Sequence, residues 1–84
     1  MTLESSYYKP PDQAMLESKA LKFVRQNDPK EYRRMKKEGE LDKYCQLKAQ
    51  AAKSYAEGLI ATGEFEKQAW YRAICLEILE HETD

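Results

Sequence analysis

The sequence has few of the residues that metal centres, disulfides and phosphate-binding loops require. Its 84 residues include two cysteines, three glycines and one histidine. Cys45 and Cys75 lie 30 positions apart, and neither has a second cysteine or a histidine close by to complete a metal set. We therefore expect both to be small buried apolar side chains and not a disulfide or redox pair. The glycines are isolated, which excludes a glycine-rich phosphate loop.

Groups that could carry out catalysis are also scarce. The single histidine, His81, lies in an acidic stretch, where only Glu77 and Glu80 could share a helical face with it and weakly hold a divalent ion. General acid-base and nucleophilic catalysis need convergent polar groups on rigid supports. We therefore expect no enzyme, no cofactor, no bound metal and no small-molecule substrate.

Long apolar runs are absent as well. No stretch approaches the roughly 20 apolar residues that a membrane-spanning helix needs. The first residues, 1–6, have neither the basic region nor the apolar stretch of a signal peptide. These observations predict a cytoplasmic protein that has no membrane partner.

Charge is balanced over the whole chain but unevenly distributed along it. The formal net charge is −1. Residues 19–53 carry eleven basic and five acidic side chains, a net charge of +6, whereas residues 54–84 carry two basic and seven acidic ones, a net charge of −5. Opposite charges of this kind hold the chain together, pair two protomers, or present a basic face to an acidic partner.

One short motif occurs twice. Residues 39–43 read Gly-Glu-Leu-Asp-Lys and residues 63–67 read Gly-Glu-Phe-Glu-Lys, and a basic residue followed by alanine comes at the same offset after each copy. A glycine that takes positive φ ends one helix, and acidic residues beside it favour the start of the next. The motif therefore predicts two similar helix-to-helix joints.

The hydrophobic pattern predicts an all-α fold. We expect a small helical bundle of three main helices plus one short basic helix, with an extended N-terminal arm. The expected divisions are a flexible arm at 1–11, a single helical domain at 12–80 and an acidic tail at 81–84. The expected helices cover about 13–27, 29–38, 41–62 and 64–80.

Helix-start signals support these boundaries. Asp12 is suited to cap the first helix. Asp28 and Pro29 form a cap followed by a first-turn proline, and Glu31 stands where it could complete a capping box. The second helix then has only Tyr32 and Met35 as apolar residues, on one face.

The last predicted helix is apolar or aromatic on every side. Between 69 and 79 only two residues are charged, and at about 100° per residue the others cover all faces of an α-helix. Three partner helices, one of them short and basic, could hardly cover such a surface, so part of it is expected to meet a second molecule. The predicted partner interface consists of Trp70, Tyr71, Ile74 and Ile78.

The basic segment supports an alternative. Its cations could contact phosphates, although neighbouring acids dilute the field and no residue suited to base readout stands out. The predicted contacts are Lys30, Arg33, Arg34, Lys36, Lys37 and Lys43.

The sequence therefore predicts a small non-enzymatic protein-binding module, an adaptor, subunit or inhibitor, that docks a protein partner or a second copy of itself as a dimer. A small nucleic-acid-binding regulator that uses residues 30–43 is the alternative.

Overall fold

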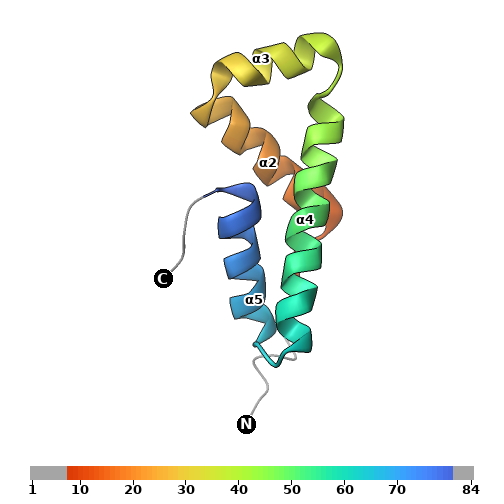
Figure 1. Cartoon of the computed structure of the whole chain (residues 1–84), viewed down its shortest axis with the longest axis vertical. Coiled ribbons are helices and arrows are strands. Elements are labelled where there is room, and N and C mark those ends of the chain that lie inside the picture. Colours follow the sequence, from red (N-terminus) through yellow and green to blue (C-terminus); the bar gives the residue numbers. More distant parts are fainter. Residues whose placement is uncertain (1–7, 81–84) are drawn as a thin grey trace.

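Every regular element of the described chain is a helix. The computed structural model describes residues 8–80. The elements are α2 (Gln13–Asn27), α3 (Pro29–Glu38), α4 (Leu41–Ala61), α5 (Glu66–Ala73) and the π-helical turn η1 (Ile74–Ile78), which continues α5 (Figure 1). This arrangement confirms the predicted all-α bundle. Residues 8–12 are not helical, whereas the rest of the predicted arm and the predicted tail lie outside the described residues.

The predicted caps begin the first two helices. The carboxylate of Asp12 accepts a hydrogen bond from the backbone N–H of Met15 at 2.8 Å. Asp28 accepts from the N–H of Glu31 at 3.3 Å, and Pro29 follows as the first residue of α3. Each cap satisfies a backbone donor that has no partner inside its helix, which typically stabilises a helix by about 1 kcal/mol.

The two joints resemble each other but are not identical. Gly39 has φ 75° and Gly63 has φ 104°, so both adopt the positive φ predicted for them. However, α4 begins two residues after Gly39, whereas α5 begins three residues after Gly63. In the second joint the extra residue is Phe65, which occupies the N-cap of α5 without a side-chain hydrogen bond to the helix.

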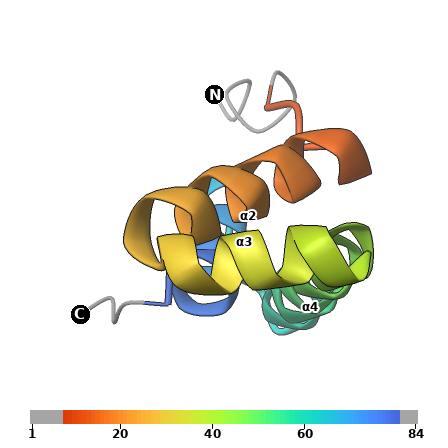
Figure 2. The same ribbon diagram turned by 90° about the horizontal axis from the view of Figure 1, so that it is seen from above.

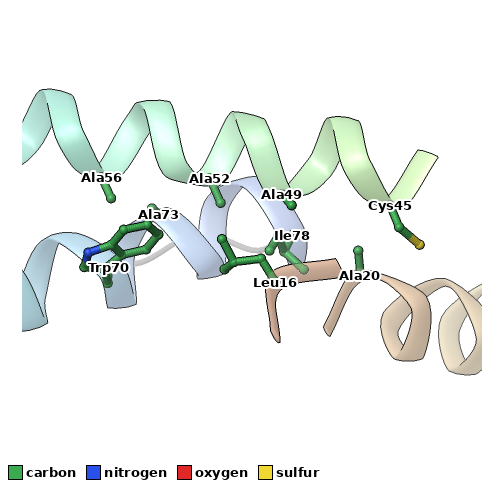
Figure 3. Packing of buried hydrophobic residues seen from close by; sticks show 9 residues of the cluster. All are labelled: Leu16, Ala20, Cys45, Ala49, Ala52, Ala56, Trp70, Ala73 and Ile78. Atoms are coloured by element: carbon green, nitrogen blue, oxygen red, sulfur yellow. The ribbon is translucent and has the colours of Figure 1, made fainter. Parts of the chain in front are cut away.

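The core lies along one face of α4. This face consists of Cys45 and three alanines, whose small side chains allow α2 and α5–η1 to approach closely. Figure 3 shows the side chains of Leu16 and Ile78 pointing toward this row from the two facing helices. The buried cluster consists of Leu16, Ala20, Cys45, Ala49, Ala52, Ala56, Trp70, Ala73 and Ile78.

The molecule is elongated, with extents of 50 × 25 × 18 Å. α4 and α5 run antiparallel along the long axis, while α3 crosses one end of the bundle (Figures 1 and 2). Only Met35 of α3 is buried, so the rest of this helix borders solvent or the edge of the bundle. α3 therefore projects at one end as a largely exposed helix.

Two further predictions concern the interior and the membrane. Cys45 and Cys75 are both buried and unbonded, as expected from their sequence context. Burial raises the pKa of the Cys45 thiol, and nearby Glu17 and Asp42 act in the same direction. Between residues 8 and 80, no helix is long and apolar enough to cross a bilayer.

Candidate binding surfaces

The four residues of the predicted interface have very different exposures. Trp70 is only 6% exposed and Ile78 is 0% exposed, so both belong to the core. Ile74 is half-buried and packs against the core, whereas Tyr71 is 62% exposed. Trp70 and Ile78 therefore present no surface to a second molecule, and the available part of the predicted interface reduces to Tyr71 and the outer edge of Ile74.

The π-helical turn explains the burial of Ile78, whereas Trp70 and Tyr71 lie before this turn, in the regular part of α5. The N–H of Leu79 donates to the carbonyl of Ile74 at 2.9 Å, which is the five-residue spacing of a π-helix. On an uninterrupted α-helix, Ile78 would lie about 140° around the axis from Ala73. The extra residue in the turn brings both side chains to the same side, where both are fully buried.

Trp70 and Cys75 are also five residues apart, as Ala73 and Ile78 are, and both are buried. The expectation that the chain cannot cover this segment therefore does not hold for its core residues. Helical periodicity distributes them around an α-helix, but the register shift at η1 gathers them on one face.

Two aromatic side chains nevertheless remain exposed on α5. Phe65 is 77% exposed and Tyr71 is 62% exposed, and they are separated by exposed Gln68 at three-residue steps. At this spacing Gln68 and Tyr71 are neighbours on the helix surface, and Phe65 precedes them as the N-cap. Arg72 and Glu64 form an ion pair of 3.4 Å beside them. This outward face of α5 (Phe65, Gln68, Tyr71 and Arg72) is the candidate protein-binding surface.

The sequence prediction missed Phe65. A signal for it exists, because serine, threonine, aspartate and asparagine are the residues that favour an N-cap, and phenylalanine supplies no cap hydrogen bond. A residue that breaks a local rule without a visible structural gain is typical of a functional position. Phe65 can be recognised as an N-cap only when the first residue of α5 is known. This helix begins at Glu66, two residues later than predicted.

Other exposed apolar residues are scattered. Met15 on α2 is 52% exposed and Leu47 on α4 is 56% exposed. Leu47 borders an open hollow between α3 and α4, together with Tyr44 and several charged residues. A second open hollow lies between Phe23 and Leu79. Single exposed apolar side chains are normal on soluble domains, so these carry less information than the aromatic pair on α5.

The six predicted phosphate-contacting cations divide into three groups. Arg34 is surrounded by carboxylates: it donates to Glu31 at 2.9 Å, to Glu38 at 2.7 Å and to Glu40 at 3.4 Å. The hydrogen bond from Arg34 lowers the pKa of Glu31 and, reciprocally, raises the pKa of Arg34. Lys43 borders the hollow between α3 and α4. The remaining four cations, Lys30, Arg33, Lys36 and Lys37, are exposed on α3.

These contacts also leave the predicted capping box half formed. The carboxylate of Glu31 binds Arg34 and does not reach back to the N–H of Asp28. That N–H instead donates to the carbonyl of Val24, at the end of the preceding helix. Because α2 and α3 share Asp28 as their junction, this donor is already satisfied.

Within residues 8–80, few ion pairs join the oppositely charged regions. Among the ion pairs of residues 8–80, only Lys48 with Glu80, at 2.7 Å, joins the basic 19–53 region to the acidic region that follows. The uneven charge was expected to hold the chain together, to pair two protomers or to bind an acidic partner. Of these, attraction within the chain is represented by this one ion pair. Pairing of protomers and binding of an acidic partner stay as predictions.

The three residues that could share a helical face and weakly hold a divalent ion are only partly described. Glu77 lies in η1 and Glu80 two residues after its end, whereas His81 is outside the described residues. Comparison of the chain with protein-family models, curated proteins and solved structures gives no match. The function therefore has to be inferred from the surfaces themselves.

Proposed function

We propose that this chain is a non-enzymatic protein-binding module that docks a partner through the outward face of α5. Phe65 and Tyr71 are its aromatic anchors. The observation that carries the proposal is that these two large side chains stay 77% and 62% exposed, although the same segment buries five other residues.

Energetics favour an interface at this face. Fully burying a phenylalanine side chain is worth about 1.5–3 kcal/mol relative to leaving it in water. Aromatic side chains are enriched at the centres of protein interfaces, where a rim of polar residues surrounds them. Gln68 and the ion pair of Arg72 with Glu64 supply such polar groups beside the two rings.

The position of Phe65 adds a second argument. The N-cap of α5 has no side-chain hydrogen bond, and a serine or aspartate there would typically add about 1 kcal/mol of stability. A chain of this size is only marginally stable, so retaining phenylalanine at this position is costly for the fold. Contact with a partner is a benefit that would offset the cost.

The buried residues of the segment support this surface from behind. Trp70 and Ile78 fix α5–η1 against α4, and half-buried Ile74 lies one α-helical turn after Trp70. A surface on a rigid helix loses less conformational freedom on binding than a surface on a loop. In this proposal Tyr71 and Ile74 keep their predicted contact role, while Trp70 and Ile78 act as the support.

Site-specific photo-crosslinking tests the proposal. A benzophenone amino acid is placed in the source cell at Phe65 or at Tyr71, with Gln50 on α4 and Ser18 on α2 as exposed control positions. We expect the same protein adduct from both α5 positions and none from the controls. Adducts at all four positions, or none at Phe65 and Tyr71, would contradict the proposal.

The same probes distinguish a second copy from another protein. If two chains pair through α5, the purified protein alone gives an adduct of twice the chain mass, and sedimentation analysis shows a dimer. If the partner is a different protein, the purified chain gives no adduct and sediments as a monomer.

A further inference from the structure

We propose that the outward face of α3 is a second, independent binding surface that holds the phosphate backbone of duplex DNA without reading its sequence. Four exposed cations form this surface, named here the α3 cation face. Its members are Lys30, Arg33, Lys36 and Lys37.

Three of the four cations form one row along the helix. Lys30, Arg33 and Lys37 follow one another at three- and four-residue steps, the spacing of neighbours on a helix surface. At 1.5 Å per residue, the row is about 10 Å long. One strand of B-DNA advances about 3.4 Å per phosphate along the duplex axis, so the row spans roughly three phosphates.

The charge of this row is not neutralised within residues 8–80. None of the ion pairs there involves Lys30, Arg33 or Lys37, and Lys36 instead lies over the ring of Tyr32 at 5.9 Å. The acids of α3, Glu31 and Glu38, lie on the flank of the helix, where both pair with Arg34. The sequence predicted that neighbouring acids weaken the positive field of the basic segment. In the structure these acids pair with Arg34, and the α3 cation face stays positive.

The position of α3 makes the face accessible. α3 crosses the end of the elongated bundle, and Met35 is its only buried residue (Figures 1 and 2). Met35 lies on the opposite side of the helix from Arg33 and Lys37, which are about 160° from it, whereas Lys36 lies on the flank, about 100° from Met35. No described element covers the outward side.

The α3 cation face lacks exposed aromatic side chains, asparagine and glutamine. This composition favours binding to duplex phosphates over binding to single strands, to a protein or to specific bases. Single-stranded nucleic acid is held by aromatic side chains that stack on bases, but Tyr32 is half-buried and covered by Lys36. Large apolar or aromatic anchors of the kind common at protein interfaces are not fully exposed on α3, since Met35 is buried and Tyr32 is half-buried. Sequence readout by asparagine or glutamine is excluded, because α3 contains neither residue.

The rest of the molecule would orient it on DNA. The chain has a net charge of −1, but residues 19–53 carry a net charge of +6 and residues 54–84 a net charge of −5. A polyanion attracts the α3 end and repels the acidic region that contains α5. The candidate surface around Phe65 and Tyr71 would then face away from DNA, so the two surfaces can be occupied together and tested separately.

The test is the salt dependence of binding to a fluorescently labelled 20-base-pair DNA duplex of mixed sequence, measured by anisotropy with the full chain. With three to four phosphates neutralised, we expect a slope of log K against log salt of about −3. Arg33→Gln and Lys37→Gln should each reduce the slope by about 1. Both residues are exposed and unpaired within the described chain, so both variants should keep the wild-type circular dichroism spectrum.

The double variant Arg34→Gln/Glu38→Gln is the matched control, because it removes the cation that adjoins Arg33 in sequence together with one of its carboxylate partners and leaves the net charge unchanged. Lys53→Gln removes an exposed cation from α4. Both controls should leave the slope unchanged. Equal losses in Arg33→Gln and in the Arg34→Gln/Glu38→Gln control would overturn the assignment to the α3 cation face, and so would absence of binding at 25 mM salt.

Two competitors test the chemistry of the ligand. Poly-glutamate should displace the labelled duplex less effectively than unlabelled duplex at equal charge, because its charges are less dense and less regular. Equal displacement would show an unspecific response to anions and overturn the proposal. Tighter binding of single-stranded DNA than of duplex would also overturn it, since that result requires stacking groups that α3 lacks.

Discussion

α3 and α5–η1 are both short helical segments of the same chain, but they bury very different amounts of themselves. α3 buries Met35 alone, whereas α5–η1 buries five residues. In α3 the exposed face agrees with simple helical periodicity. In α5–η1 it does not, because the π-helical turn changes which residues share a side. Periodicity therefore predicts exposure only where the helical register is continuous.

Removing a core side chain from each segment should give the largest difference. Ile78→Ala removes a fully buried side chain beside the alanine row of α4 and should destabilise the bundle by about 2–5 kcal/mol. Met35→Ala should release mainly α3, because it is the only buried residue of that helix. Urea denaturation measures the first effect and amide hydrogen exchange resolves the second. Equal protection of α3 and α4 amides in Met35→Ala would contradict the comparison.

Deleting Ile74 tests the register shift directly. The deletion converts the five-residue spacings from Trp70 to Cys75 and from Ala73 to Ile78 into four-residue spacings, which suit a continuous α-helix. We expect a folded protein with the same buried residues and a loss of about 1 kcal/mol from the half-buried isoleucine.

Backbone chemical shifts should report α-helix through the former η1 in the deletion variant. A one-residue deletion at Gln68, before both spacings, is the control: it leaves the π-turn intact and should rotate Phe65 and the helix start relative to the core. If the Ile74 deletion unfolds the chain, the register explanation is wrong.

Phe65→Ser should separate stability from binding. Serine can accept a hydrogen bond from a first-turn N–H of α5, so we expect the free energy of unfolding to rise by about 1 kcal/mol. The same change removes an aromatic anchor, so the adduct formed by a probe at Tyr71 should disappear. Thermal denaturation and crosslinking measure the two effects. A variant that is less stable than wild type would assign Phe65 a structural role.

The smallest expected effect is the pH response of α3. The hydrogen bond from Arg34 lowers the pKa of Glu31 from its usual value of 4.5. A carboxyl group with a lowered pKa in the folded state contributes stability above pH 4.5, and this contribution is lost as the pH falls through the folded-state pKa. Glu31→Gln should abolish this part of the acid dependence of α3 amide exchange. α5 amides, which lie outside the network, serve as the internal control.

The sequence was sufficient for most of the fold. Asp12, Asp28 with Pro29, and Gly39 are local signals, and the helices they predict begin and end where expected. The π-turn could not be predicted from local signals, because it forms where packing against α4 selects which apolar residues face inward. An α-helical pattern assigned to residues 64–80 consequently placed Ile78 at the surface. Trp70 lies before the turn, in the regular part of α5, where it is buried with Ala69 and Ala73.

The binding surfaces were only partly predictable for related reasons. The separation of Arg34 from the other cations follows from acids three residues before and four residues after it, a spacing visible in the sequence. The third acid, Glu40, belongs to the next joint and depends on how the chain turns at Gly39. The exposure of Phe65 depends on where α5 starts, which the acidic residues after Gly63 do not fix.

The alanine row of α4 has a consequence for the temperature dependence of stability. Ala49, Ala52 and Ala56 are fully enclosed, yet each contributes little apolar area when the chain unfolds. The heat-capacity change of unfolding should therefore lie at or below about 12 cal/mol/K per residue, the lower end of the usual range. With an unfolding enthalpy of about 60 kcal/mol expected for 84 residues, the stability curve is low and broad. The bundle should lose little stability on cooling and should melt gradually.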